Sequence, residues 1–178
     1  MNAAPVKHHI IQGEYLVLDD ENAVISTILG SCVSACMHDP GLGLGGMNHF
    51  LLPGEGGREG LQYGAYAMEL LINGMLSRGA RRDRLQAKLF GGGRLLRGLT
   101  DIGRKNGEFA ERFLKDEGIP CLGSSLGGDH ARRIIFSPAS GRVRQQKLVD
   151  IDQNRVFESE SKPKRPNVSS GDIELFGG

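Results

Sequence analysis

The stretch STILGSCVSACMHDPGLGLGGMNHFLLP, residues 26–53, holds two short apolar runs on either side of a turn signal. The first run, residues 32–39, has the length of a strand, although a short helix that begins near Ser31 is the alternative. Residues 39–41, Asp-Pro-Gly, are typical of a tight turn, and the second run covers residues 45–52. The pattern predicts two antiparallel strands joined as a hairpin.

This hairpin would bring a thiol close to an imidazole. Pairing around the turn places residue 34 opposite His49 and residue 51 opposite Cys32. Directly opposed side chains lie about 5 Å apart and diagonal ones about 7–8 Å, so Cys32 and His49 can meet. A shift of register by one residue would turn His49 to the other face of the sheet.

The sequence on both sides of the hairpin predicts further strands and two amphipathic helices. Apolar residues at helical spacing predict helices over residues 61–78 and 102–117, each followed by a glycine. The mixture indicates an α+β fold. Segments rich in β-branched and aromatic residues predict strands over residues 8–19 (with a glycine interruption), 23–29, 84–90, 119–126, 132–137 and 143–149.

The bulk composition indicates a soluble protein with no charge excess to attract nucleic acid. The chain has 178 residues, 39% of them hydrophobic and 24% charged, and a net charge of +1. No apolar run approaches the roughly 18 residues that span a membrane, so we expect no membrane insertion. The N-terminus lacks the apolar region of a secretory signal. The three cysteines, an odd number, favour the reducing cytoplasm.

The composition changes after about Phe157. We therefore expect one domain over residues 1–157 and a disordered tail over residues 158–178, because the tail begins with a charged segment rich in proline and serine. The last six residues, IELFGG, are apolar again and are either a stray end or a docking peptide.

Cys32 and His49 suggest nucleophilic catalysis. A thiolate is the nucleophile, and a neighbouring histidine stabilises it and protonates the leaving group. Gly30 permits a sharp turn that presents the sulfur and aims backbone N–H groups at a developing oxyanion. The alternative is a buried, inert cysteine with a partly buried histidine. Spacing does not choose the group that would orient the histidine, for which the candidates are Thr27, Ser26, Asn48 and Asp39.

Three other kinds of site are weaker matches. A zinc site would use Cys32, Cys36, His38 and His49, but their spacing matches no common structural site. A redox sensor would pair Cys32 with Cys36, which are four positions apart and pair poorly within a strand. Residues 90–98, FGGGRLLRG, lack both the Lys-Ser/Thr of a phosphate-binding loop and the spacing of a dinucleotide fingerprint, so a tight turn or close packing is favoured.

The sequence resembles the CheD family, the chemoreceptor glutamine deamidases of bacterial chemotaxis. The resemblance covers roughly residues 10–150, in the order that the family shows. Its segments are TILGSCVSACMHDP, GGMNHFLLP, YGAYAMELLINGML, KLFGGG, IGRKN and SLGGDHARRIIFSPASGRV.

The resemblance implies roles for three residues. Cys32 matches the nucleophile, His49 the general base and Thr27 the third member, in a family that converts receptor glutamines to glutamates through a thioester and releases ammonia. It also implies a single-domain sandwich of mixed β-sheets with helices packed on the outside, and no metal or organic cofactor.

The resemblance implies partners as well. These are the cytoplasmic helices of chemoreceptors, which are the substrate, and a CheC-type phosphatase. The alternative function is a binding regulator of receptors or of that phosphatase, with little turnover.

Overall fold

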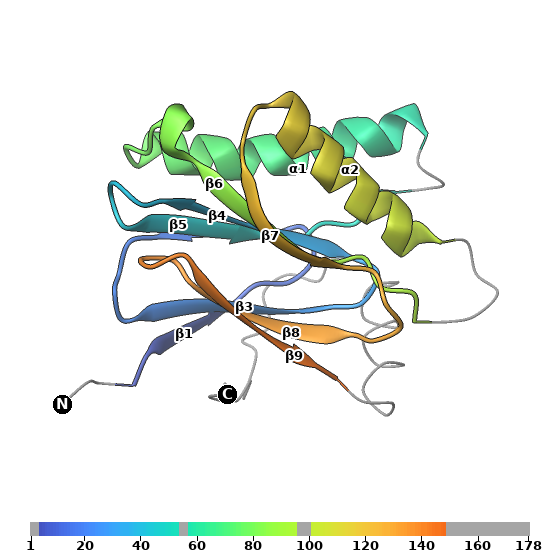
Figure 1. Cartoon of the computed structure of the whole chain (residues 1–178), viewed down its shortest axis with the longest axis horizontal. Coiled ribbons are helices and arrows are strands. Elements are labelled where there is room, and N and C mark those ends of the chain that lie inside the picture. Colours follow the sequence, from blue (N-terminus) through green and yellow to red (C-terminus); the bar gives the residue numbers. More distant parts are fainter. Residues whose placement is uncertain (1–3, 54–56, 96–100, 149–178) are drawn as a thin grey trace.

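Nine strands form two sheets in the computed structural model, which describes residues 4–53, 57–95 and 101–148 (Figure 1). The four-stranded sheet has the order β1-β3-β8-β9, which are Val6–His9, Ala23–Leu29, Arg132–Ser137 and Arg142–Lys147. The five-stranded sheet has the order β2-β5-β4-β6-β7, which are Tyr15–Leu18, Leu44–Asn48, Val33–Asp39, Gln86–Gly91 and Cys121–Leu126. Each sheet contains one parallel pair, β1 with β3 and β6 with β7, so both sheets are mixed.

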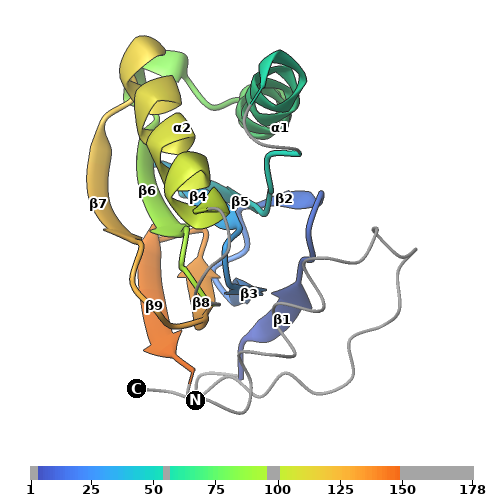
Figure 2. The same ribbon diagram turned by 90° about the vertical axis from the view of Figure 1, so that its right-hand side faces the viewer.

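The molecule has three layers. Helices α1 (Arg58–Ser77) and α2 (Ile102–Asp116) cover one face of the five-stranded sheet, and the four-stranded sheet packs on its other face (Figure 2). A short 3-10 helix, η1 (Arg82–Arg84), precedes β6. The predicted α+β sandwich with outer helices is therefore confirmed, with both helices on one side. Neither described helix is long and apolar enough to cross a membrane.

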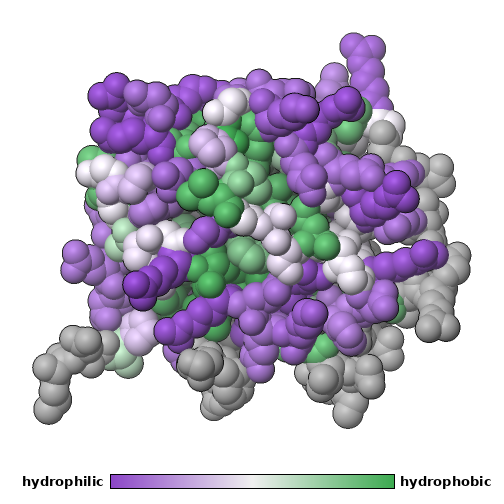
Figure 3. Space-filling view, viewed as in Figure 1, coloured by the Kyte–Doolittle hydropathy of each residue, from purple (hydrophilic) through white to green (hydrophobic). Residues whose placement is uncertain are grey.

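Two apolar layers lie on the two faces of the five-stranded sheet, because successive side chains of a strand point to opposite faces. From β4, Val33, Ala35 and Met37 pack toward the helices. Cys32 and Cys36 belong to the cluster between the two sheets, with Met47, Phe90, Ile25, Leu29 and Phe136 among their neighbours. Figure 3 shows a further apolar area that is open to solvent in the middle of the face it presents. On β7, Leu122 is 57% exposed.

The predicted hairpin and its register are confirmed. Cys36 pairs with Met47, and an isolated bridge pairs Val33 with Phe50, so the same register continues to the end of the hairpin. It places His49 opposite residue 34, as the sequence predicts. The strand is adopted over residues 33–39 in place of the alternative helix near Ser31.

The segment predicted as one strand over residues 8–19 forms two strands, β1 and β2, in different sheets. Gly13 lies between them with a φ of 88°, a left-handed conformation that favours glycine. The predicted domain boundary at Phe157 and the tail over residues 158–178 lie outside the described residues.

An ion pair between the buried Asp39 and the partly exposed Arg84 holds the turn of the hairpin. The carboxylate of Asp39, at the end of β4, is fully buried and accepts two hydrogen bonds of 2.9 Å from the Arg84 guanidinium. It also accepts backbone N–H groups of Gly41 and Arg81. The Arg84 hydrogen bonds hold the pKa of Asp39 down, at about 2.

Asp39→Asn is expected to lower the free energy of unfolding by about 2 kcal/mol at neutral pH, because it removes charge-assisted hydrogen bonds. A depressed carboxyl pKa stabilises the fold above the pKa of the unfolded chain, and that contribution is lost as the pH falls through the folded value. Urea titrations between about pH 5 and pH 2 should therefore show a shallower acid destabilisation in Asp39→Asn than in the unsubstituted protein.

Asp83→Asn is the matched control. Asp83 pairs with Arg81 nearby, but both side chains are about two-thirds exposed. Its loss should change the free energy of unfolding by less than about 1 kcal/mol and leave the acid dependence as it is. Equal effects of the two substitutions would contradict the role given to Asp39.

Candidate active site

Thr27, Cys32 and His49 all lie in the layer between the two sheets. Thr27 lies on β3 of the four-stranded sheet, Cys32 directly precedes β4, and His49 directly follows β5. Thr27 and Cys32 are fully buried, and His49 is 5% exposed. The site is therefore built across the interface of the sandwich, with Thr27 from one sheet and the other two residues from the facing sheet.

A chain of hydrogen bonds sets the protonation of the His49 ring. The Thr27 hydroxyl donates its proton to the carbonyl oxygen of Ile10 at 2.8 Å. The same oxygen lies 2.7 Å from Nδ1 of His49. Because the hydroxyl has a single proton, it accepts from Nδ1–H, and the neutral ring carries its basic lone pair on Nε2. In this tautomer Nε2 is the ring nitrogen that is able to accept a proton.

The connection between β1 and β2 fixes both members of this pair. Besides the carbonyl of Ile10, it supplies the N–H of Gly13, which donates to the carbonyl of His49 at 2.7 Å. The N–H of His49 in turn donates to the carbonyl of Glu14 at 3.1 Å. The sequence does not predict that residues 10–14 bind Thr27 and His49, because they do so through backbone groups, which any residue has. The only unusual feature of this segment in the sequence is the glycine at position 13.

Cys32 lies where the chain passes from one sheet to the other. Gly30 and Ser31 connect β3 to β4, and the carbonyl of Cys32 accepts the N–H of Gly92 at 2.8 Å. Directly after it, Val33 exchanges two backbone hydrogen bonds with Phe50. With residue 34 opposite His49, Cys32 lies diagonally across from His49 on the same face of the hairpin.

The other candidates for orienting His49 are engaged elsewhere. Asp39 lies at the far end of β4 in its ion pair with Arg84. Asn48 points to the helix side, where its Oδ1 accepts the N–H of Ala35. Ser26 lies on the opposite face of β3 from Thr27, with its hydroxyl 3.4 Å from Nδ1 of His9. The packing of sheet on sheet therefore distinguishes Thr27 from the alternatives that spacing left open.

The geometry does not support the zinc site, the Cys32–Cys36 redox pair or the phosphate-binding loop that the sequence left as alternatives. Among the described residues, no three His, Cys, Asp or Glu side chains form a group that could hold a metal ion. Cys36 lies four strand positions from Cys32, roughly 13 Å along the chain, which is too far for a disulfide. Burial raises the pKa of the Cys36 thiol to about 12. The N–H groups of Gly92 and Gly93 bind the carbonyls of Cys32 and Gly30, so they do not cradle a phosphate.

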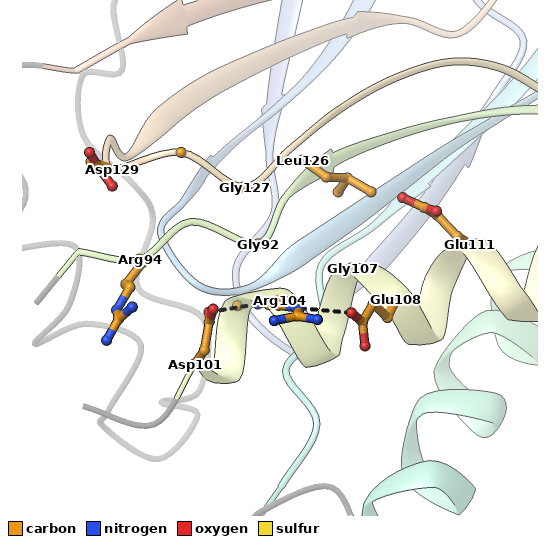
Figure 4. A pocket seen from close by; sticks show the side chains of 12 residues that line it. Gly92, Arg94, Asp101, Arg104, Gly107, Glu108, Glu111, Leu126, Gly127 and Asp129 are labelled. Carbon is orange, nitrogen blue, oxygen red and sulfur yellow. Dashed lines mark hydrogen bonds and ion pairs between the residues drawn. The ribbon is translucent and has the colours of Figure 1, made fainter. Parts of the chain in front are cut away.

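A pocket of about 350 Å³ lies on the helix side of the Cys32 segment (Figure 4). Gly92, whose N–H holds the Cys32 carbonyl, and Gly127 line it on one side, and α2 lines it on the other. Thr27, Cys32 and His49 are not among its lining residues. Its charged side chains are Arg94, Asp101, Arg104, Glu108, Glu111 and Asp129.

Comparison with solved structures gives only distant likenesses. A Bacillus licheniformis hypothetical protein, YfiH, has a TM-score of 0.42 and 18% identity, covering 63% of this chain and 50% of that one. YlmD from Geobacillus stearothermophilus has a TM-score of 0.42 and 16% identity, covering 64% and 50%. Likenesses at this level carry no argument about fold or function.

Comparison of sequences gives close relatives. Residues 51–147 match the family model described as CheD chemotactic sensory transduction. A probable chemoreceptor glutamine deamidase CheD of Caulobacter sp. (strain K31) is 56% identical over 176 residues, covering 96% of this chain and 93% of that protein. The protein of the same name from Agrobacterium fabrum is 53% identical over 180 residues, covering 99% of both chains. The chain therefore belongs to the CheD family.

Proposed function

We propose that this chain deamidates glutamine side chains in the cytoplasmic helices of chemoreceptors, with Cys32 as the nucleophile, His49 as the general base and Thr27 as the residue that orients His49. The 2.7 Å hydrogen bond between Thr27 and His49 carries the proposal, because it prepares one ring nitrogen for proton transfer on the face that Cys32 shares. The names of the relatives, probable chemoreceptor glutamine deamidases, support the substrate.

The first half-reaction forms a thioester. Nε2 of His49 takes the proton of the Cys32 thiol, and the sulfur attacks the side-chain amide carbon of glutamine. As the tetrahedral intermediate collapses, the carbon–nitrogen bond breaks and His49 gives its proton to the leaving nitrogen. The products are ammonia and a glutamyl thioester of Cys32.

The second half-reaction restores the thiol. Water attacks the thioester carbon while Nε2 of His49 accepts a proton from it. The carbon–sulfur bond breaks, the sulfur regains a proton from His49, and glutamate leaves. The Thr27 hydroxyl accepts from Nδ1–H throughout and stabilises the imidazolium that forms twice in the cycle.

The product carries the regulatory consequence. Each glutamine converted adds one negative charge to a receptor helix, and such a charge biases the packing of neighbouring helices. The cytoplasm, where these helices lie, is the proposed location. A CheC-type phosphatase is the further partner that the family resemblance implies.

Cys32→Ala is expected to abolish deamidation, because no other group supplies the thioester bond. Incubation of a receptor cytoplasmic domain with the unsubstituted protein should raise its intact mass by about one dalton per converted glutamine, and incubation with Cys32→Ala should not. Cys36→Ala is the matched control. It changes a buried cysteine of the same cluster between the two sheets, and should keep the rate within about twofold.

Two outcomes would argue against this assignment. Undiminished mass gain with Cys32→Ala would remove the nucleophile from the mechanism. Restoration of chemotaxis by Cys32→Ala in a deletion strain would instead favour the binding regulator, since binding alone would then suffice.

Thr27→Val is expected to lower kcat by about 10²-fold, because valine keeps the shape of threonine but cannot accept from Nδ1–H. Thr27→Ser, which keeps the hydroxyl, should recover most of the rate. Nitrogen-15 NMR of the histidine side chains gives an independent measurement. His49 should show the Nδ1–H tautomer in the unsubstituted protein and in Thr27→Ser, and a mixture in Thr27→Val. A normal kcat in Thr27→Val would contradict the role of Thr27 in orienting His49.

A further inference from the structure

We propose that Asn106 of α2 is a positioning residue that holds the Cys32 segment and the His49 segment at a fixed separation. Its side chain is fully buried. Nδ2 donates to the carbonyl of Ser31 at 2.8 Å, and Oδ1 accepts the N–H of Leu52 at 3.1 Å. Ser31 directly precedes Cys32, and Leu52 follows His49 by three positions. The inference deepens the proposed function and rests on it for the roles of Cys32 and His49.

The Asn106 amide is inserted between the two strands of the hairpin, where a direct backbone hydrogen bond would otherwise form. In an antiparallel pair, every second pair of residues exchanges backbone hydrogen bonds. Val33 and Phe50 are such a pair, and the same register makes Ser31 and Leu52 the next. Their direct N–H to carbonyl bond is replaced by two bonds through the Asn106 amide. The strands therefore part by the width of an amide beside Cys32.

Asn106 is one of three hydrogen-bond donors that hold the backbone carbonyls of residues 30–32. The carbonyl of Gly30 accepts the N–H of Gly93 at 2.9 Å, and the carbonyl of Cys32 accepts the N–H of Gly92 at 2.8 Å. The carbonyl between them, on Ser31, is the one that Asn106 holds. Three consecutive carbonyls are thus fixed, and Asn106 supplies the one side-chain donor among these three bonds.

Glycines allow α2 to come close enough for this contact. A Cβ at Gly103, one turn before Asn106, would lie 2.2 Å from the carbonyl oxygen of Gly93 and 2.6 Å from Gly92. At Gly107, the residue after Asn106, an added Cβ would only make an ordinary van der Waals contact with Leu126, at 3.5 Å, so the close approach depends on Gly103. Figure 4 shows this part of α2 beside Gly92. The helix is therefore seated on the same backbone that binds Cys32, which fixes the distance that the Asn106 side chain spans.

If the Asn106 side-chain amide is removed, the chain segments at Ser31 and Leu52 can respond in two ways. If they stay apart, a buried carbonyl and a buried N–H lose their partners. If they close, Ser31 and Leu52 bond directly and Cys32 shifts relative to His49. A shift of about 1 Å at a reacting group costs on the order of 10²-fold in rate. KM should change little, because a fully buried side chain does not touch the receptor.

The test compares three variants in deamidation kinetics with a receptor cytoplasmic domain. Asn106→Ala should lower kcat by about 10²-fold with KM within about twofold of the original. Asn106→Leu keeps the side-chain size but has neither a donor for the Ser31 carbonyl nor an acceptor for the Leu52 N–H, so it should lower kcat similarly. Asp39→Asn is the control. It destabilises the far end of β4, the strand that follows Cys32, and should leave kcat unchanged.

A second measurement needs no substrate. The rate of Cys32 alkylation by iodoacetamide, followed by peptide mass spectrometry, should reach its half-maximum at a higher pH in both Asn106 variants than in the unsubstituted protein, because the thiol moves away from His49. Simple destabilisation, as in Asp39→Asn, would leave that midpoint in place.

The two measurements separate the possible failures. Normal kcat and an unmoved alkylation midpoint in Asn106→Leu overturn the positioning role, even if Asn106→Ala does not fold. Absence of any mass gain with the unsubstituted protein overturns the proposed function, while the alkylation profile still tests Asn106.

Discussion

The hydrogen bond between Thr27 and His49 is the polar contact on which the site depends, because it crosses an otherwise apolar layer. Ile25, Leu29, Met47 and Phe136 belong to the layer around it. A polar group buried in such surroundings is costly unless its partners are in place, so the bond is satisfied only when the two sheets meet at one distance and one offset. The sheet interface thus fixes the geometry of the site, and the same interface excludes water from it.

Cys32, the proposed nucleophile, lies on a segment that is held as firmly as His49, but from the other side of the five-stranded sheet. His49 and Thr27 take their backbone partners from the connection between β1 and β2, whereas the Cys32 segment takes its partners from the end of β6 and from α2. The helix layer therefore does more than cover an apolar face. Through Asn106, α2 supplies the side-chain amide that separates the hairpin strands at Ser31 and Leu52, next to Cys32.

The sequence predicts local features of this fold well and non-local ones poorly. The turn at Asp39 and the apolar pattern on both sides of it predict the hairpin and make an approach of Cys32 to His49 possible, but only the observed pairing of Cys36 with Met47 and of Val33 with Phe50 settles the register. The division of residues 8–19 between two sheets does not follow, because both halves have the same β-strand character and their partners lie far along the chain. Thr27 is distinguished from its neighbours only by the packing of one sheet on another. Neither the Ile10 carbonyl nor the insertion of Asn106 has a pattern that sequence alone displays.

Two amides interrupt the same ladder, and together they specify its register. Ala35 donates to Oδ1 of Asn48 where a backbone carbonyl would accept, and Asn106 bridges Ser31 and Leu52 two rungs further on. Apolar patterning alone resists a one-residue slip only by the cost of burying the wrong face. Here a slip would also leave both amides, and the backbone groups they satisfy, without partners in a buried layer. The hairpin that carries the thiol and the imidazole is therefore held in register by polar contacts as well as apolar ones, which is what the proposed proton exchange between Cys32 and His49 requires.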